Sequence, residues 1–276
     1  MKRRGKLLLA ALLVGVLGGG AVMFGLRGGR GEVPGPFLYT GEPLAAGAEA
    51  RLTEGGWTLG DTGAPTPLRT LTRPPAPGQT RWLVFFGGNG GGYLADARAV
   101  LEALDGGRGL GLAAVAPPGF DGSPGTPSPE ALRAGAEAAV RWLSATHQPG
   151  AGNVDLLGFS MGTGAALAAA HALAKDGTPA RSLTLLAPYS RMDVTFPGLW
   201  GRIRVPDRYD NLALTSPGLP PARVLHGMAD QALPASHGME LARRLGGHFK
   251  GYPGVGHLEL LKDPDVLAEA RAGLLP

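Results

Sequence analysis

Three residues that can act together in nucleophilic catalysis occur in order along the second half of the chain. Ser160 lies within 158-GFSMG-162, Asp230 ends the segment 227-GMAD-230, and His257 follows in a glycine-rich stretch. A serine hydroxyl is a poor nucleophile until a base takes its proton, and an imidazole serves as that base when a carboxylate orients it. The order and the residue types predict attack by Ser160, with His257 as the base and Asp230 as the orienting acid.

The glycines around Ser160 favour a sharp turn between a buried strand and a helix. In such a turn the flanking positions tolerate little side chain, and the hydroxyl stands at the helix N-terminus, where backbone amides favour developing negative charge. A serine at this place can also serve only as a helix N-cap. The pattern alone leaves both interpretations open, and the later acid and base favour the nucleophile.

Serine catalysis also needs donors for the negative charge that develops on the substrate oxygen. The loop 87-GGNGGGY-93 follows an apolar run, and its backbone is expected to supply one N–H while Met161 supplies another. The same glycines could cradle a phosphate. However, the loop lacks the Lys-Ser/Thr of a P-loop and does not match G-x-G-x-x-G, so the sequence favours an oxyanion loop.

Alternating strand-like and helix-like segments must position these residues. Strands are predicted at 82–86, 112–117, 154–159, 183–188, 223–227 and 248–252, and helices at 93–104, 129–145, 161–175, 235–245 and 264–273. Upstream, 49–53, 57–61 and 68–72 are expected to form an antiparallel start of the sheet. This alternation is typical of a mostly parallel α/β sheet with helices on both faces, whose ligands bind beyond the carboxyl ends of the strands.

The composition fits one sizeable α/β domain and excludes several classes of site. The chain has 276 residues, 44% of them hydrophobic, and no cysteine, which excludes disulfides, thiol catalysis and cysteine-based metal sites. The formal charge of +4 arises in the first 30 residues, and the remainder holds 20 basic and 22 acidic residues. A nucleic-acid binder would carry a basic stripe on its folded domain, so no nucleic acid is expected as a partner.

The N-terminal segment 1–30 predicts export. Its basic residues precede an uncharged stretch at 7–26, about 30 Å long if helical, which is enough to cross a bilayer. The segment is a retained membrane anchor, a signal peptide cleaved near Gly19 and Ala21, or a buried helix of the fold, and the first two interpretations are favoured. The domain at 31–276 is therefore expected outside the cytoplasm, anchored to the membrane or secreted.

Five segments in order resemble the α/β-hydrolases, and more narrowly the Bem46-type serine hydrolases with a minimal cap. Within 78–272 they are 87-GGNGG-91, 117-PPGFDGSPGTPSPE-130, 158-GFSMGTGAA-166, 226-HGMADQALP-234 and 256-GHLEL-260. The resemblance implies the α/β-hydrolase fold, a mostly parallel eight-stranded sheet with antiparallel N-terminal strands. It implies Ser160, Asp230 and His257 as catalytic residues, and the backbone N–H groups of Asn89 and Met161 as the oxyanion hole. In the family a histidine stands where this chain has Gly87.

A short, lid-like excursion is expected at 189–219, between two strands. Residues that follow strand ends are expected to line the substrate pocket: Tyr93, Phe120 and Tyr189. Four apolar residues of the excursion could line an acyl pocket or pack the excursion onto the domain: Phe196, Leu199, Trp200 and Tyr209.

The sequence thus predicts a carboxylesterase-like serine hydrolase that needs no metal and no cofactor. It would cleave an ester, thioester or amide of a small-molecule or lipid-like acyl substrate through an acyl-enzyme on Ser160. Two alternatives remain open. One is a non-catalytic, membrane-tethered binding protein on a hydrolase fold, and the other is an acyltransferase or peptidase of the same fold.

Overall fold

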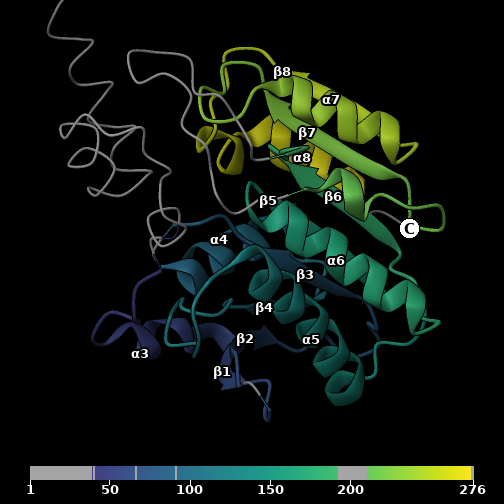
Figure 1. Ribbon diagram of the computed structural model, residues 1–276. Coiled ribbons are helices and arrows are strands. Elements are labelled where there is room, and N and C mark those ends of the chain that lie inside the picture. The colour runs from purple at the N-terminus through teal and green to yellow at the C-terminus, as the bar shows by residue number, and fades with distance from the viewer. Residues whose placement is uncertain (1–38, 40, 66, 91, 192–209, 275–276) are drawn as a thin grey trace, which may run out of the picture.

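An eight-stranded sheet forms the centre of the molecule. The structure is a computed structural model that describes residues 39, 41–65, 67–90, 92–191 and 210–274. The spatial strand order is β1-β2-β4-β3-β5-β6-β7-β8 (Figure 1). The strands are β1 (Thr58–Asp61), β2 (Arg69–Arg73), β3 (Trp82–Phe86), β4 (Gly111–Val115), β5 (Val154–Phe159), β6 (Ser182–Leu186), β7 (Ala222–Gly227) and β8 (His248–Tyr252).

The sheet is mostly parallel, as the sequence predicted. The pairs β1–β2 and β2–β4 are antiparallel. The pairs from β4 through β3, β5, β6 and β7 to β8 are all parallel. The carboxyl ends of β3, β5, β6, β7 and β8 therefore lie along one edge, and the loops that follow them can meet there.

Helices cover both faces of this sheet (Figure 1). One apolar cluster joins the sheet to α5 (Pro129–His147), α6 (Gly162–Lys175) and α7 (Ala235–Arg244). The other joins it to α4 (Tyr93–Asp105) and α8 (Pro264–Ala272). Short 3₁₀ helices are η2 (Glu54–Gly56), η3 (Leu212–Leu214) and η4 (Glu259–Leu261). Because both faces are covered, β3 and β5 bury every residue.

Capping residues set where two helices begin. The Ser128 hydroxyl accepts the N–H of Ala131 at 3.1 Å, and Pro129 takes the first helical position of α5, where no N–H is needed. Asp263 and Pro264 begin α8 in the same way, with the carboxylate accepting two backbone N–H groups. These signals explain why both helices start where the sequence predicted.

One predicted strand is wrong. Residues 49–53 do not pair with the sheet, and the one-turn helix α3 (Ala48–Leu52) stands there instead. Alanine, glutamate, arginine and leucine are strong helix formers, and Leu52 is the one buried residue of α3. A single apolar contact fits a helical turn as well as a strand, so the short segment did not distinguish the two.

Two predicted features fall outside the described residues. The N-terminal segment 1–30 is one, and the part of the excursion at 192–209, with Phe196, Leu199, Trp200 and Tyr209, is the other. Among the residues that the structure describes, no helix combines the length and the apolar character that crossing a bilayer requires.

Candidate active site

Ser160 stands at a tight turn between β5 and α6. Its φ of 52° lies in the left-handed region, which L-residues with a side chain rarely adopt. A Cβ atom at Gly158 would lie 2.6 Å from the carbonyl oxygen of Gly162, and one at Gly162 would lie 2.1 Å from that of Phe86. Both flanking positions must therefore be glycine for the turn to close, which explains the residues around the serine.

Three side chains from three separate loops meet at this edge. Nε2 of His257 lies 2.9 Å from Oγ of Ser160, and Nδ1 of His257 lies 2.6 Å from Oδ2 of Asp230. Because a carboxylate only accepts, Nδ1 carries the proton and Nε2 is left to accept from the serine hydroxyl. The structure thus brings together the three side chains that sequence analysis selected.

Backbone hydrogen bonds tie the acid loop to the base loop. The N–H of Met228 donates to the carbonyl of Tyr252 at 2.9 Å, and that of Ala229 donates to Val255 at 2.9 Å. The His257 ring also rests against Phe159, with 5.0 Å between ring centroids. These contacts hold the imidazole between its two partners.

Hydrogen-bond donors surround the carboxylate of Asp230. Oδ1 accepts the N–H groups of Ala232 and Leu233, each at 2.8 Å, and the side chain is 0% exposed. Burial, the largest single influence, opposes ionisation. The hydrogen bonds from His226 and His257 and the backbone outweigh it, so the pKa of Asp230 falls well below its usual range. The acid is therefore a carboxylate at neutral pH, while the His257 side chain is 12% exposed.

The glycine-rich loop after β3 runs beside the nucleophile. A Cβ atom at Gly88 would lie 3.6 Å from Cβ of Ser160. Asn89 is half-buried, and Met161 is the buried N-cap residue of α6. This placement is compatible with oxyanion donors at Asn89 and Met161, and their role stays a prediction.

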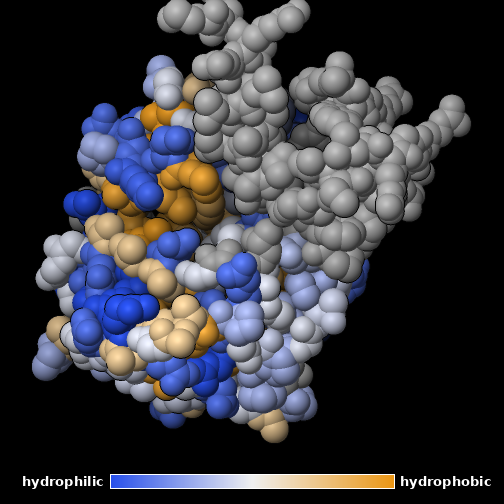
Figure 2. All heavy atoms as spheres, turned by 90° about the vertical axis from the view of Figure 1, so that its left-hand side faces the viewer, coloured by the Kyte–Doolittle hydropathy of each residue, from blue (hydrophilic) through white to orange (hydrophobic). Residues whose placement is uncertain are grey.

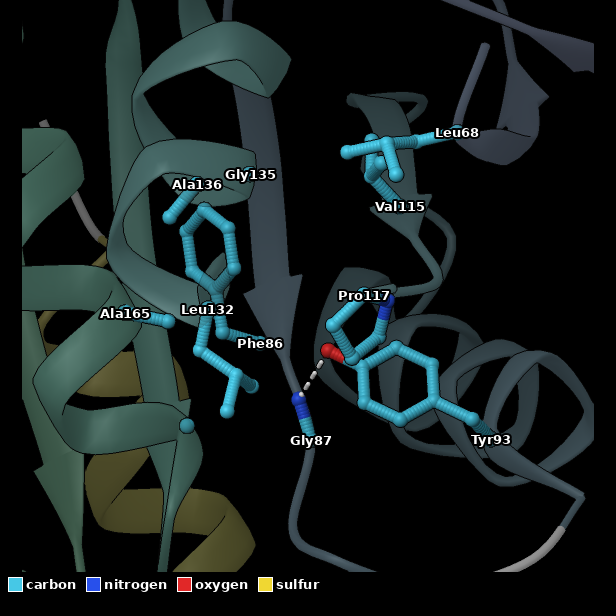
Figure 3. A pocket seen from close by; sticks show the side chains of 11 residues that line it. Leu68, Phe86, Gly87, Tyr93, Val115, Pro117, Leu132, Gly135, Ala136 and Ala165 are labelled. Carbon is cyan, nitrogen blue, oxygen red and sulfur yellow. Dashed lines mark hydrogen bonds between the residues drawn. The ribbon is translucent and has the colours of Figure 1, made fainter. Parts of the chain in front are cut away.

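Tyr93 supports the start of this loop, a role that sequence analysis missed. Its hydroxyl accepts the N–H of Gly87 at 2.7 Å (Figure 3). Its ring fills the space that a side chain at position 87 would need, 2.9 Å from the Cβ position. Burial raises the pKa of Tyr93, so the hydroxyl stays neutral. Glycine at position 87 thus leaves the space that the ring of Tyr93 occupies, and the hydroxyl of Tyr93 accepts the N–H of that glycine.

The three residues predicted to line the substrate pocket lie in the core. Tyr93 is 5% exposed, and Phe120 and Tyr189 are 0% exposed. Phe120 packs edge-on against Tyr93, with 5.9 Å between centroids. Next to it, Asp121 accepts the N–H of Leu94 at 2.6 Å and so caps the start of α4. These residues support the site from beneath, and their contact with a substrate stays a prediction.

A small cavity lies on the inner side of Gly87 and has room for about one water molecule (Figure 3). Its lining combines residues of β3, α5 and α6 with Tyr93 and Pro117. It is too small to hold an acyl group.

Apolar side chains flank the acid and the base at the surface. Met228, two residues before Asp230, and Leu258, directly after His257, are each 52% exposed. Figure 2 views the molecule from the left-hand side of Figure 1 and shows hydrophobic side chains gathered between hydrophilic ones.

Among the described residues, no group of three or more histidine, aspartate and glutamate side chains could hold a metal ion.

Comparison with curated proteins finds distant relatives. No family model matches the chain. An uncharacterized protein of Mycobacterium tuberculosis is 30% identical over 185 residues, which are 65% of this chain and 63% of that protein. Protein ABHD12B of Homo sapiens is 28% identical over 183 residues, 55% of this chain and 49% of that protein. The chain thus matches less than two thirds of the length of either relative.

Comparison with solved structures finds esterases. Esterase 2 of Thermogutta terrifontis, in its apo form, has a TM-score of 0.59 at 20% identity, over 79% of this chain and 92% of that one. An esterase of Pyrobaculum calidifontis has a TM-score of 0.59 at 17% identity, over 82% and 88%. At such identities the likeness shows the shared fold alone, and the narrower Bem46-type likeness is not confirmed.

Proposed function

Because the chain has the α/β-hydrolase fold, we propose that it is a serine hydrolase that cleaves carboxylic esters through an acyl-enzyme on Ser160. One observation carries the proposal: Ser160, His257 and Asp230 form a continuous line of hydrogen bonds of 2.9 and 2.6 Å. A nucleophile, a base and an orienting acid in hydrogen-bond reach of one another are what acyl transfer by serine requires.

The first half of the reaction forms the acyl-enzyme. As Oγ of Ser160 attacks the ester carbonyl carbon, Nε2 of His257 takes the hydroxyl proton. The carbonyl π electrons move to oxygen, and in this proposal the N–H groups of Asn89 and Met161 stabilise that oxyanion. When the carbon–oxygen bond to the alcohol breaks, His257 returns the proton to the leaving alcohol. Water then repeats the sequence, releases the acid and restores the serine.

Asp230 provides the electrostatic support for this proton transfer. Its carboxylate is ionised, fully buried and 2.6 Å from Nδ1 of His257. It therefore stabilises the imidazolium that forms during each attack and holds the ring with Nε2 toward the serine. Removing it would leave His257 free to adopt the other tautomer.

The surroundings of the site favour an acyl substrate, small or lipid-like. Met228 and Leu258 provide apolar surface beside the acid and the base, where a hydrocarbon chain would lose contact with water. Among the structural relatives, the Thermogutta esterase has been solved with propionate bound and phosphoramylated by tabun. By analogy, short acyl esters and organophosphorus probes are suitable first ligands for this chain.

The test combines a covalent probe with ester turnover. A fluorophosphonate should label the wild type, and p-nitrophenyl esters from acetyl to palmitoyl should be hydrolysed. Ser160→Ala should lose labelling and at least about 10⁴-fold in kcat. Ser190→Ala is the matched control, because Ser190 is also buried and its Oγ lies 2.7 Å from Nδ1 of His237. Labelling at Ser190, or none on a folded wild type, would reject the proposal.

We also propose that the domain at 31–276 lies outside the cytoplasm, tethered or released by its N-terminal segment. The basic and apolar character of residues 1–30 supports this placement. Protease accessibility in intact cells and sequencing of the mature N-terminus would decide it. A protein with an intact N-terminus that is protected from external protease would contradict the proposal.

A further inference from the structure

A second histidine lies against the acid of the site, and the mechanism above does not use it. His226, near the end of β7, is 0% exposed. Its Nε2 lies 3.4 Å from Oδ2 of Asp230 and 3.0 Å from the carbonyl oxygen of Leu233. Oδ2 is the same oxygen that faces His257. One carboxylate oxygen is thus approached by two imidazoles.

The partners of His226 determine where its proton lies. The Leu233 carbonyl and the Asp230 carboxylate both accept and cannot donate. If Nε2 were unprotonated, its lone pair would face two oxygens and be repelled by both. Nε2 therefore carries a proton that is shared between these two acceptors.

The other ring nitrogen shows that His226 is neutral. Nδ1 is buried and has no hydrogen-bond partner among the residues that the structure describes. A Cβ atom at Gly238 of α7 would lie 2.8 Å from it, so the helix packs directly against this side of the ring. A proton on Nδ1 would be buried without an acceptor, which is costly. The ring is therefore a neutral donor that takes no proton during catalysis.

The surroundings of the ring contain few other charges. Gly238 of α7 packs on it, and Val224 of β7 and Phe249 of β8 lie beside the same point. None of these three titrates. Within the described part of the chain, Asp230 is the ionisable partner of His226, and His257 lies on the far side of Oδ2. A side chain that only filled this space would need no polar atom, so the donor on Nε2 is the feature to explain.

We propose that His226 is a positioning residue of the site, which holds the carboxylate of Asp230 with Oδ2 turned toward His257. The N–H of Leu233 donates to Oδ1 of Asp230, and its carbonyl accepts from His226. The imidazole thereby closes the turn at 230–233 around the carboxylate and occupies the second acceptor position of Oδ2. This role rests on the proposed function, since it acts through Asp230 on the base.

Two substitutions at position 226 separate donation from space filling. His226→Phe keeps a flat ring but removes the donor, and kcat should fall about five- to tenfold, the effect of one lost hydrogen bond. The acidic limb of kcat/KM should move to higher pH, because Oδ2 then presents more negative charge to His257 and favours its protonated form. His226→Gln places an amide N–H near Nε2 and should restore most of the rate and the original limb.

His171→Gln is the matched control. His171 of α6 also directs Nε2 at a backbone carbonyl, that of Leu214, but lies away from the acid. This variant should keep both the rate and the pH profile of the wild type. A folded His226→Phe with unchanged kcat and an unchanged profile would overturn the proposal, as would a His226→Gln no better than His226→Phe.

Nitrogen NMR of the wild type tests the contact without any variant and without turnover. His226 should appear as the Nε2–H tautomer at neutral pH. A proton on Nδ1, or a charged ring at neutral pH, would overturn the proposal. If the wild type neither labels nor hydrolyses esters, the proposed function fails, whereas the tautomer still decides whether His226 donates to Asp230.

Discussion

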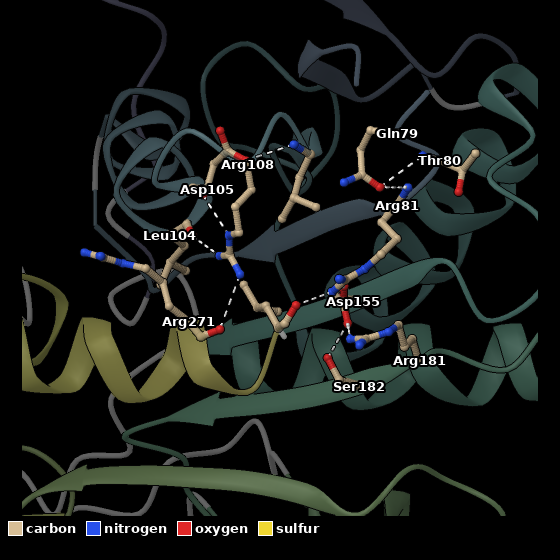
Figure 4. A network of polar contacts seen from close by, with 12 residues as sticks. Gln79, Thr80, Arg81, Leu104, Asp105, Arg108, Asp155, Arg181, Ser182 and Arg271 are labelled. Atoms are coloured by element: carbon tan, nitrogen blue, oxygen red, sulfur yellow. Dashed lines mark hydrogen bonds and ion pairs between the residues drawn. The ribbon is translucent and has the colours of Figure 1, made fainter. Parts of the chain in front are cut away.

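Two buried aspartates lie at opposite ends of the parallel strands, and different partners hold them. Asp230, at the carboxyl ends, is bound by imidazole and by backbone amides. Asp155, at the amino end of β5, is bound by Arg81 at 2.8 Å, Arg181 at 3.1 Å and the hydroxyl of Ser182 at 2.5 Å (Figure 4). Both carboxylates are 0% exposed.

The partners decide what each carboxylate can do. A guanidinium keeps its proton at any working pH, so the contacts of Asp155 are permanent. Arg81 also donates to the carbonyl of Leu274 at 2.5 Å, which ties the segment after α8 to the start of the sheet. An imidazole gives and takes a proton near neutral pH. The same residue type therefore acts as a clamp at one end of the sheet, whereas at the other end it would support proton transfer in the proposed reaction.

The largest expected effect comes from Asp230→Asn. An amide in place of the carboxylate would present a donor to His257, favour the wrong tautomer and leave no charge to stabilise the imidazolium. We expect kcat to fall about 10⁴-fold in a protein that still folds. Ester kinetics together with circular dichroism provide the measurement, and a loss below about tenfold would show that Asp230 has no role in proton transfer.

Asp155→Asn should show the opposite pattern. It leaves Arg81 and Arg181, 16% and 22% exposed, without their shared counter-charge. We expect the free energy of unfolding to fall by about 3 kcal/mol, with kcat per folded molecule unchanged. Denaturant unfolding and active-site titration separate the two quantities. A variant of full stability but reduced kcat would remove the distinction between the two ends of the sheet.

Much of the fold could be predicted because its signals are local. A continuous apolar run marked β3, and the alternation of strand-like with helix-like segments placed α5 and α8, whose predicted starts coincide with the caps Ser128 and Asp263. The segment that forms α3 was misread because it has one buried contact, too few for a pattern to separate a turn of helix from a strand. Local sequence signals do not predict the secondary structure of a segment when tertiary contacts determine it.

Ser160, Asp230 and His257 could likewise be selected, because each lies in the loop that follows a predicted strand. The supporting roles of Tyr93 and His226 could not be found in this way. Tyr93 becomes a support only when β3 and α4 bring its hydroxyl to the N–H of Gly87. The role of His226 depends on the turn that places Leu233 and Asp230 around Nε2. Spacing along the chain does not show such contacts, since they depend on how the folded backbone brings these residues together.

Tyr93→Phe extends the comparison of the two aspartates to a neutral side chain, the hydroxyl of Tyr93, at the carboxyl ends of the strands. It leaves the buried N–H of Gly87 without its acceptor and frees the start of the glycine-rich loop after β3. We expect kcat to fall about tenfold with little change in KM, and the free energy of unfolding to fall by about 1 kcal/mol. Steady-state kinetics check the split. A raised KM at constant kcat would show instead that Tyr93 acts in substrate binding.

The smallest effect is expected in the acid stability of the protein. The pKa of Asp230 is lower in the folded protein than the usual value of about 3.9 for an unfolded chain. Its ionised form therefore contributes stability that is complete above that value and is lost as the pH falls below it. Asp230→Asn lacks this contribution at every pH, while all other carboxylates are the same in the wild type and the variant. The difference in unfolding free energy between the two proteins should thus shrink from pH 6 to about pH 3. Denaturant titrations at both pH values would measure it, and a difference that stays constant or grows would mean that Asp230 is not held as a stabilised carboxylate.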